Sequence, residues 1–111
     1  MERTLANGRR LRAALIEFGL GSLAPRAEEI LETDTFWQFG RKPLRIDILT
    51  DIPAVTFASA WKRRIVVQVH DVEVPILGLD DLIANKRAAG RAKDRVDADM
   101  LEAVRSLSKR R

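Results

Sequence analysis

Cysteine is absent from this sequence of 111 residues. Without thiols the chain can form neither a disulfide framework nor a metal site built on thiolates. Because disulfide bonds belong to oxidising compartments, a chain without cysteine suits a reducing one. We therefore expect a cytoplasmic protein.

Long apolar runs are also missing. No stretch approaches the roughly 18 apolar residues that a membrane span requires. The charged residues between Met1 and Arg12 do not lead into a long apolar run either. We expect neither export nor membrane insertion.

The sequence has little histidine and few features that separate domains. His70 is the only histidine and lies beside Asp71 in a predicted turn, which offers little to a catalytic triad or a histidine metal site.

Internal repeats, low-complexity tracts and flexible linkers are not found. We expect a single domain that spans residues 1–111.

What the chain does have is an ordinary globular composition with a modest basic excess. Apolar residues make up 46%, charged residues 32%, and the formal net charge is +4. This balance predicts a stable fold, and the charge makes nucleic acid or a nucleotide a candidate partner. The excess lies mainly at the two ends, where solvated termini are the simpler interpretation: Arg9, Arg10, Arg12, Lys109, Arg110 and Arg111.

Hydrophobic periodicity and turn residues predict an α+β succession of elements. In chain order we expect a helix at 5–20, a helical turn at 25–30, strands at 35–39 and 44–50, a short helix at 57–63, a hairpin of 65–69 and 72–76, and helices at 79–89 and 93–107. We interpret Trp37 and Trp61 as core residues rather than surfaces for stacking bases.

One acidic residue interrupts an apolar strand. Leu44, Ile46 and Ile48 share one face of the strand at 44–50, and Asp47 points to the other. A carboxylate there is either a solvated edge residue or a metal or base position, and the spacing leaves both interpretations open.

Lys86 is anomalous because it continues the helical stripe of Leu79, Leu82 and Ile83 where a fourth apolar residue is expected. An unpaired charge beside a core is strongly disfavoured, so Lys86 must reach water or meet a partner. Asp94 and Asp97 lie three residues apart on one face of the last helix. We therefore predict a cluster of lysine and aspartate between the two last helices.

Two interpretations of this cluster stay open. It is either an ion-pair network that holds the two helices together or a site for phosphate, since a lysine and arginines oriented by carboxylates can hold a triphosphate or a magnesium nucleotide.

Three segments of the chain together resemble a known family. The longest, Val74 to Asp97, reads VPILGLDDLIANKRAAGRAKDRVD, and Leu101 follows it; upstream lie ALIEFGLGSL from Ala14 and PLRIDILT from Pro43. Over nearly the whole chain and in the same order, they are similar to small bacterial nucleotidyltransferase-like domains. These domains are relatives of abortive-infection nucleotidyltransferase toxins and, more remotely, of aminoglycoside nucleotidyltransferases.

The resemblance implies a mixed β-sheet with helices packed on it. It also implies that Asp47 is the third carboxylate of a catalytic Mg²⁺ site, that Lys86 and Arg91 contact the phosphates of a nucleoside triphosphate (NTP), and that Asp94 and Asp97 orient those two cations.

The departure from the family concerns its first segment. Members begin with a strand, a Gly-Gly or Gly-Ser turn and an Asp-x-Asp pair that holds Mg²⁺. We find no such segment and expect the chain to correspond to the last two-thirds of the fold. Gly21-Ser22 followed by Glu32 and Asp34 imitates the motif, but no strand-forming run precedes it.

Three hypotheses follow from these patterns. The first is a truncated nucleotidyltransferase-like domain, inactive alone or part of a split enzyme, whose apolar faces invite a homodimer or a partner chain. The second is a non-catalytic binding module for nucleic acid or a protein. The third is an enzyme that acts through Glu32 and Asp34.

Overall fold

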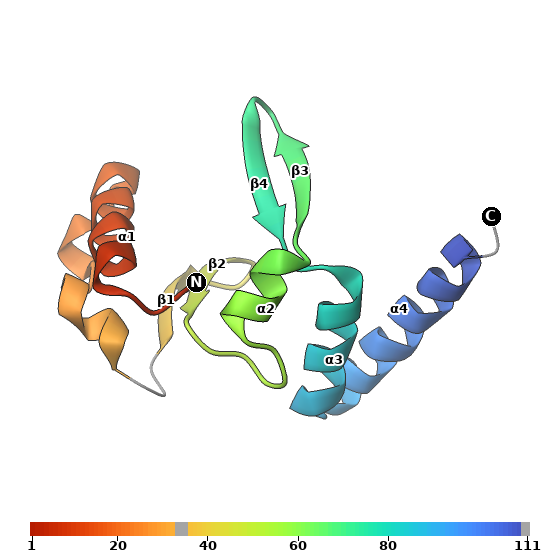
Figure 1. Cartoon of the computed structure of the whole chain (residues 1–111). Coiled ribbons are helices and arrows are strands. Elements are labelled where there is room, and N and C mark those ends of the chain that lie inside the picture. The colour runs from red at the N-terminus through yellow and green to blue at the C-terminus, as the bar shows by residue number, and fades with distance from the viewer. Residues whose placement is uncertain (33–35, 110–111) are drawn as a thin grey trace. The chain divides into compact units, whose positions relative to one another are not determined.

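The computed structural model describes residues 1–32 and 36–109, which form four α-helices, two short 3₁₀ helices and four strands (Figure 1). The α+β class expected from the sequence is confirmed. Contacts divide the chain into two units, Met1–Asp51 and Ile52–Arg111. That residues 1–111 form one domain stays a prediction.

The first unit is built on helix α1 (Leu5–Phe18). The Thr4 side chain caps its start by accepting a 3.2 Å hydrogen bond from the backbone N–H of Asn7. Helix α1 packs against the second 3₁₀ helix, η2 (Ala27–Leu31), whose Ile30 is almost completely buried. The first, η1 (Gly21–Leu23), follows α1 directly. The expected helix and helical turn are thus confirmed.

A hairpin completes the first unit. Strands β1 (Phe36–Arg41) and β2 (Leu44–Leu49) pair antiparallel, with Phe39 opposite Ile46 and Gln38 opposite Asp47. Both lie within two residues of the expected ends, although the expected start at Thr35 lies outside the described residues.

The second unit begins with helix α2 (Phe57–Lys62), capped by Thr56. Strands β3 (Ile65–Val69) and β4 (Val72–Ile76) form the predicted hairpin around His70 and Asp71. Helix α3 (Leu79–Ala89) starts after Gly78 as expected, and helix α4 (Ala92–Lys109) packs against it. None of the helices in the described ranges is long and apolar enough to cross a membrane.

The strands do not form the mixed sheet that the family resemblance implied. Among residues 1–32 and 36–109 they make two separate two-stranded antiparallel sheets, β1–β2 and β3–β4. The physical reason lies in the connections. Two residues join each pair of strands, and such a tight turn can only return the chain antiparallel.

Several large apolar residues are exposed. Phe18, the last residue of α1, is 70% exposed, and helix α2 buries none of its residues. Phe57 and Trp61 stack on each other instead, with ring centroids 5.8 Å apart. The interpretation of Trp61 as a core residue is therefore wrong: the residue is 45% exposed, and its ring lies against Phe57 and the Arg64 guanidinium.

Candidate functional site

The junction between α3 and α4 gathers the charged residues singled out in the sequence. Gly90 ends α3 with a left-handed φ of 71°, a conformation that glycine adopts without the steric cost of a side chain. The chain then turns at once into α4. Lys86 in the last turn of α3 thereby faces Asp94 in the first turn of α4.

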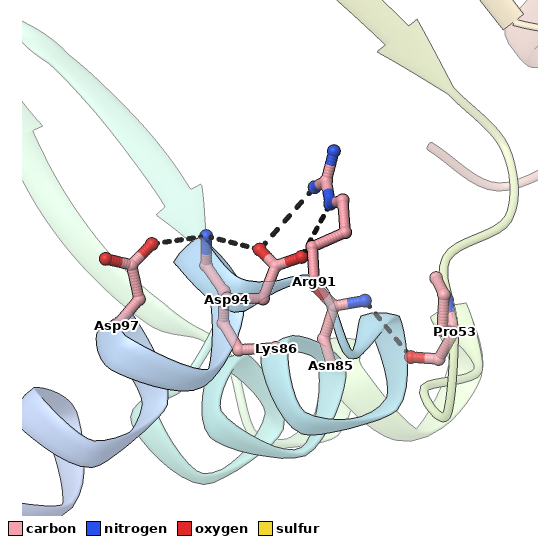
Figure 2. Close-up of polar contacts among 6 residues, drawn as sticks. All are labelled: Pro53, Asn85, Lys86, Arg91, Asp94 and Asp97. Carbon is pink, nitrogen blue, oxygen red and sulfur yellow. Dashed lines mark hydrogen bonds and ion pairs between the residues drawn. The ribbon is translucent and has the colours of Figure 1, made fainter.

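Four side chains form a line of alternating charge at this junction (Figure 2). The Lys86 ammonium lies 3.0 Å from a carboxylate oxygen of Asp97 and 3.4 Å from one of Asp94. Arg91 donates from Nε to the other Asp94 oxygen at 2.6 Å. The predicted contact of Lys86 with both carboxylates is confirmed. We call Lys86, Arg91, Asp94 and Asp97 the Lys86 cluster.

Burial within the Lys86 cluster is uneven. The Asp94 side chain is 2% exposed, that of Lys86 27% and that of Arg91 80%. A buried carboxylate is stable only when it is paired and hydrogen-bonded, and Asp94 meets that condition with two cations. The cluster therefore has a fixed acidic centre and cations that reach solvent.

Hydrogen bonds set the protonation of this cluster. Those from Arg91, and then from Lys86, lower the pKa of Asp94 below its ordinary 3.8 against the opposing effect of desolvation. A hydrogen bond to Asp97 is the main cause that raises the pKa of Lys86 above 10.5, with a smaller contribution from Asp94. Both groups are therefore charged at neutral pH.

A further bond fixes the segment before α2 next to the cluster. The Asn85 amide donates to the carbonyl oxygen of Pro53 at 3.1 Å (Figure 2). Asn85 directly precedes Lys86, so the last turn of α3 is held both by α4 and by this loop.

Asp47 lies in the first unit, on β2, and already has a cationic partner. Two nitrogens of Arg45 approach its carboxylate at 3.0 and 3.1 Å. Magnesium prefers six oxygen ligands, and no group of three or more His, Cys, Asp or Glu able to hold a metal exists among the described residues. The side chains described therefore do not fit a magnesium site.

Sequence reasoning missed a second buried carboxylate. Asp81 in the first turn of α3 is 6% exposed and accepts three hydrogen bonds of 2.6 to 3.2 Å from Arg63, which caps the end of α2. The two residues are 18 positions apart, and acidic residues are common in the first turn of any helix, so no local pattern pairs them. This ion pair ties α2 to α3.

Other predicted residues fall partly outside the described ranges. The alternative motif of Glu32 and Asp34 cannot be placed because Asp34 lies outside them, as do Arg110 and Arg111 of the basic end. These remain hypotheses.

Comparisons with protein-family models, with curated proteins and with solved structures found no match to this chain. The nucleotidyltransferase-like assignment thus rests on the residues quoted from the sequence, and the roles of Asp47, Lys86, Arg91, Asp94 and Asp97 stay predictions.

Proposed function

We propose that this chain is a nucleotidyltransferase-like domain that binds the phosphates of an NTP at the Lys86 cluster. The observation that supports the proposal is the placement of Lys86 and Arg91 on either side of the buried Asp94 carboxylate. Two cations held by one rigid group are pre-organised for an anion with several oxygens.

Hydrogen-bond donors remain for such a ligand. An ammonium has three N–H groups and a guanidinium five, whereas Lys86 contacts two carboxylates and Arg91 contacts one. The guanidinium of Arg91 is largely exposed, so its remaining N–H groups can meet phosphate oxygens in the planar, two-pronged geometry that arginine favours.

Charge limits the affinity of this site. Asp94 and Asp97 together offset the charges of Lys86 and Arg91, so a phosphate meets a formally neutral cluster. We therefore expect weak binding that improves when Mg²⁺ accompanies the NTP and neutralises part of its charge.

Catalysis requires more than this cluster. Asp47, whose role as third carboxylate comes from the family resemblance, is one acidic residue paired with Arg45. We propose that the remaining metal-binding carboxylates come from another segment or a partner chain, and that the described residues bind NTP without transferring its nucleotidyl group.

Isothermal titration with ATP, GTP, CTP and UTP, each with and without Mg²⁺, tests the proposal. Lys86→Ala should abolish binding, and Arg91→Ala should weaken it by at least about fivefold, the equivalent of one lost charged hydrogen bond. Arg87→Ala is the matched control, because Arg87 lies on the same helix and pairs with the exposed Asp99. Absence of NTP binding in the wild type, or equal binding in Lys86→Ala, would refute the proposal.

A second candidate function, binding of single-stranded nucleic acid, is favoured by an exposed group on α2. The Arg64 guanidinium lies 4.1 Å from the ring centroid of Trp61, which stacks on Phe57, and Lys62 is adjacent. Aromatic rings and cations side by side can stack bases and pair with phosphates. We call Phe57, Trp61, Lys62 and Arg64 the α2 patch.

Fluorescence anisotropy with labelled single-stranded RNA separates the two functions. If the α2 patch binds RNA, Trp61→Ala weakens binding by about fivefold or more, and the affinity falls steeply with salt. Phe18→Ala, which removes an exposed aromatic from α1, should leave it unchanged. Equal losses in both variants, or no RNA binding at all, would exclude this function.

A further inference from the structure

The turn before helix α2 holds one residue in an unusual backbone conformation. Ile52 and Val55 form an isolated antiparallel bridge, and Pro53 and Ala54 make the two-residue turn between them. Ala54 has a φ of 65°, in the left-handed region that residues other than glycine rarely occupy. Its side chain strains the backbone there, so another contact must hold the turn in this form.

The φ angles identify the turn as type II. Proline fixes its own φ at about −65°, and a positive φ at the next residue distinguishes type II from the commoner type I, in which both central residues have a negative φ. The two types differ by a reversal of the peptide between the central residues, so the Pro53 carbonyl points in opposite directions in them. Alanine at the second central position favours type I.

Asn85 of α3 accounts for the type II form. Its side-chain amide donates to the Pro53 carbonyl oxygen at 3.1 Å, and a reversal of the peptide would turn this oxygen away (Figure 2). The stabilisation from one hydrogen bond and the cost of a left-handed alanine are of similar size and opposite sign. The turn is therefore close to balance between a bonded, strained form and a free, relaxed form.

This balance affects α2 because little else holds that helix. No residue of α2 is buried, and an isolated helix of six residues is unstable in water. Just beyond the end of α2, Arg63 pairs with the buried Asp81, which lies four positions before Asn85 on α3. Positions four apart lie on one side of a helix, so Asp81 and Asn85 hold the two ends of one segment. We call this segment, residues 53–63, the strap.

We propose that the strap opens from α3 by reversal of the Pro53–Ala54 peptide. While Asn85 holds the Pro53 carbonyl, both ends of the strap are attached to α3. When the peptide reverses, Ala54 loses its strain, the strap stays attached through Arg63, and α2 frays from its first turn. This proposal does not depend on nucleotide or RNA binding.

Opening of the strap takes apart the aromatic pair on α2. Phe57 and Trp61 are four positions apart, and their rings stack because one helical turn brings them together. A change at the end of α3 that withdraws the Asn85 amide therefore separates the two rings without contacting either of them.

Two substitutions should change the protection of the α2 amides in opposite directions. Asn85→Ala removes the bond to the Pro53 carbonyl, so amide exchange in α2 should accelerate by about threefold or more. Ala54→Gly removes the strain of the bonded form, so exchange should slow by about two- to fivefold, although glycine usually loosens a chain. Saturation transfer from water, followed residue by residue in NMR spectra, measures these rates.

The double variant separates a switch from a simple loss of contact. Without Asn85 the turn is already relaxed, so Ala54→Gly in the Asn85→Ala background should no longer slow exchange. The nuclear Overhauser effect between the Pro53 Hα and the Ala54 amide proton reports the turn type, because these protons lie closer in type II than in type I. It should be strong in the wild type and weak in Asn85→Ala.

Ala24→Gly is the matched control for the glycine substitution. Ala24 also lies outside the helices and strands, but it has an ordinary φ of −67°. Its replacement should lower the urea midpoint of unfolding, because glycine has more freedom to lose on folding, whereas Ala54→Gly should raise that midpoint.

Four results would overturn the proposal. They are α2 amides that exchange equally fast in the wild type and in Asn85→Ala, faster α2 exchange in Ala54→Gly than in the wild type, an equal effect of Ala54→Gly with and without Asn85, and an Overhauser effect between Pro53 and Ala54 that stays strong in Asn85→Ala.

Discussion

At the scale of single residues, Asp94 determines the geometry of the Lys86 cluster. It is the only member that is almost completely buried, and both cations contact it. Asp97 is more exposed and meets Lys86 alone among the cluster. Loss of the Asp94 charge should therefore disturb the cluster more than loss of the Asp97 charge.

We expect Asp94→Asn to destabilise the protein more than Asp97→Asn, and Asp99→Asn to be close to neutral. Asparagine keeps the shape and one acceptor oxygen but leaves Lys86 and Arg91 without their shared counter-charge. Urea unfolding at pH 7 measures the free energy of unfolding of each variant and so gives their order of stability. Equal destabilisation by Asp94→Asn and the exposed control Asp99→Asn would show that the ion pairs at the junction contribute nothing.

The stabilising effect of the Asp94 carboxylate should depend on pH. Because the pKa of Asp94 is lower in the folded state than its ordinary 3.8, its charge stabilises the fold above that value, and this stabilisation is lost as the pH falls through the folded pKa. The pKa of Lys86 is raised in the folded state, so the Lys86 charge stabilises the fold at lower pH. This stabilisation is lost only as the pH rises above 10.5.

Unfolding measured from pH 2 to 9 tests this dependence. The difference in stability between wild type and Asp94→Asn should be constant near neutral pH and should shrink below 3.8. A difference that stays the same down to pH 2 would mean that a lost side-chain contact, and not the charge, causes it.

At the scale of elements, α1 and η2 meet at a glycine. A Cβ on Gly8 would overlap the carbonyl oxygen of Ala27 and lie 2.8 Å from a methyl group of Ile30. Helix propensity alone favours alanine over glycine by about 1 kcal/mol. Steric overlap would lower the free energy of unfolding of Gly8→Ala, whereas the higher helix propensity of alanine would raise it. The sign of the measured change therefore tells whether α1 packs closely against η2.

We expect Gly8→Ala to lower the free energy of unfolding by about 1 to 3 kcal/mol, as overpacking does. The control, Ala13→Gly, changes an exposed position of the same helix and should cost about 1 kcal/mol through propensity. Denaturant unfolding gives both values. A stabilised Gly8→Ala variant would contradict the close approach of α1 and η2.

The contact between α3 and α4 depends on Ala98 in a similar way. Its side chain is completely buried between the helices, and Ala98→Leu should destabilise the protein by about 1 to 3 kcal/mol. Ala103→Leu enlarges an exposed residue of α4 and should have little effect on unfolding. A small effect at both positions would mean that the helices do not pack as described.

At the scale of the whole molecule, the few buried apolar residues contrast with the many exposed ones. Among the described positions, the buried apolar residues are Leu15, Ile30 and Phe39 in the first unit and Ile83 and Ala98 in the second. On the β3–β4 hairpin, the aliphatic cross-strand pairs Ile65–Ile76, Val67–Val74 and Val69–Val72 share one face. Small sheets of two strands are marginal alone, so cover by another surface would stabilise the hairpin.

This exposure predicts binding of the hydrophobic dye ANS by the native protein. At neutral pH, ANS emission should rise several-fold above that in 6 M guanidinium. Native emission no higher than that of the unfolded chain would show that the apolar faces are covered.

Local pattern determined most of the elements of this protein. The hairpin of β3 and β4 and the helix α3 have the expected ends, because turn residues and Gly90 act within a few positions of the chain. Lys86 was found as a break in an apolar stripe, and helical spacing alone proposed Asp94 and Asp97 as its partners. Composition and spacing were sufficient for these features because their causes are short-range.

Only the tertiary structure decided what covers each face. It shows that Phe18 and Trp61 are exposed, that Arg63 pairs with Asp81, and that α4 turns its buried face to α3 while its stripe of large apolar residues stays open. Periodicity indicates that a helix has an apolar side but not which neighbour packs against it. Burial is a property of contacts between segments distant in sequence, and no pattern within one segment contains it.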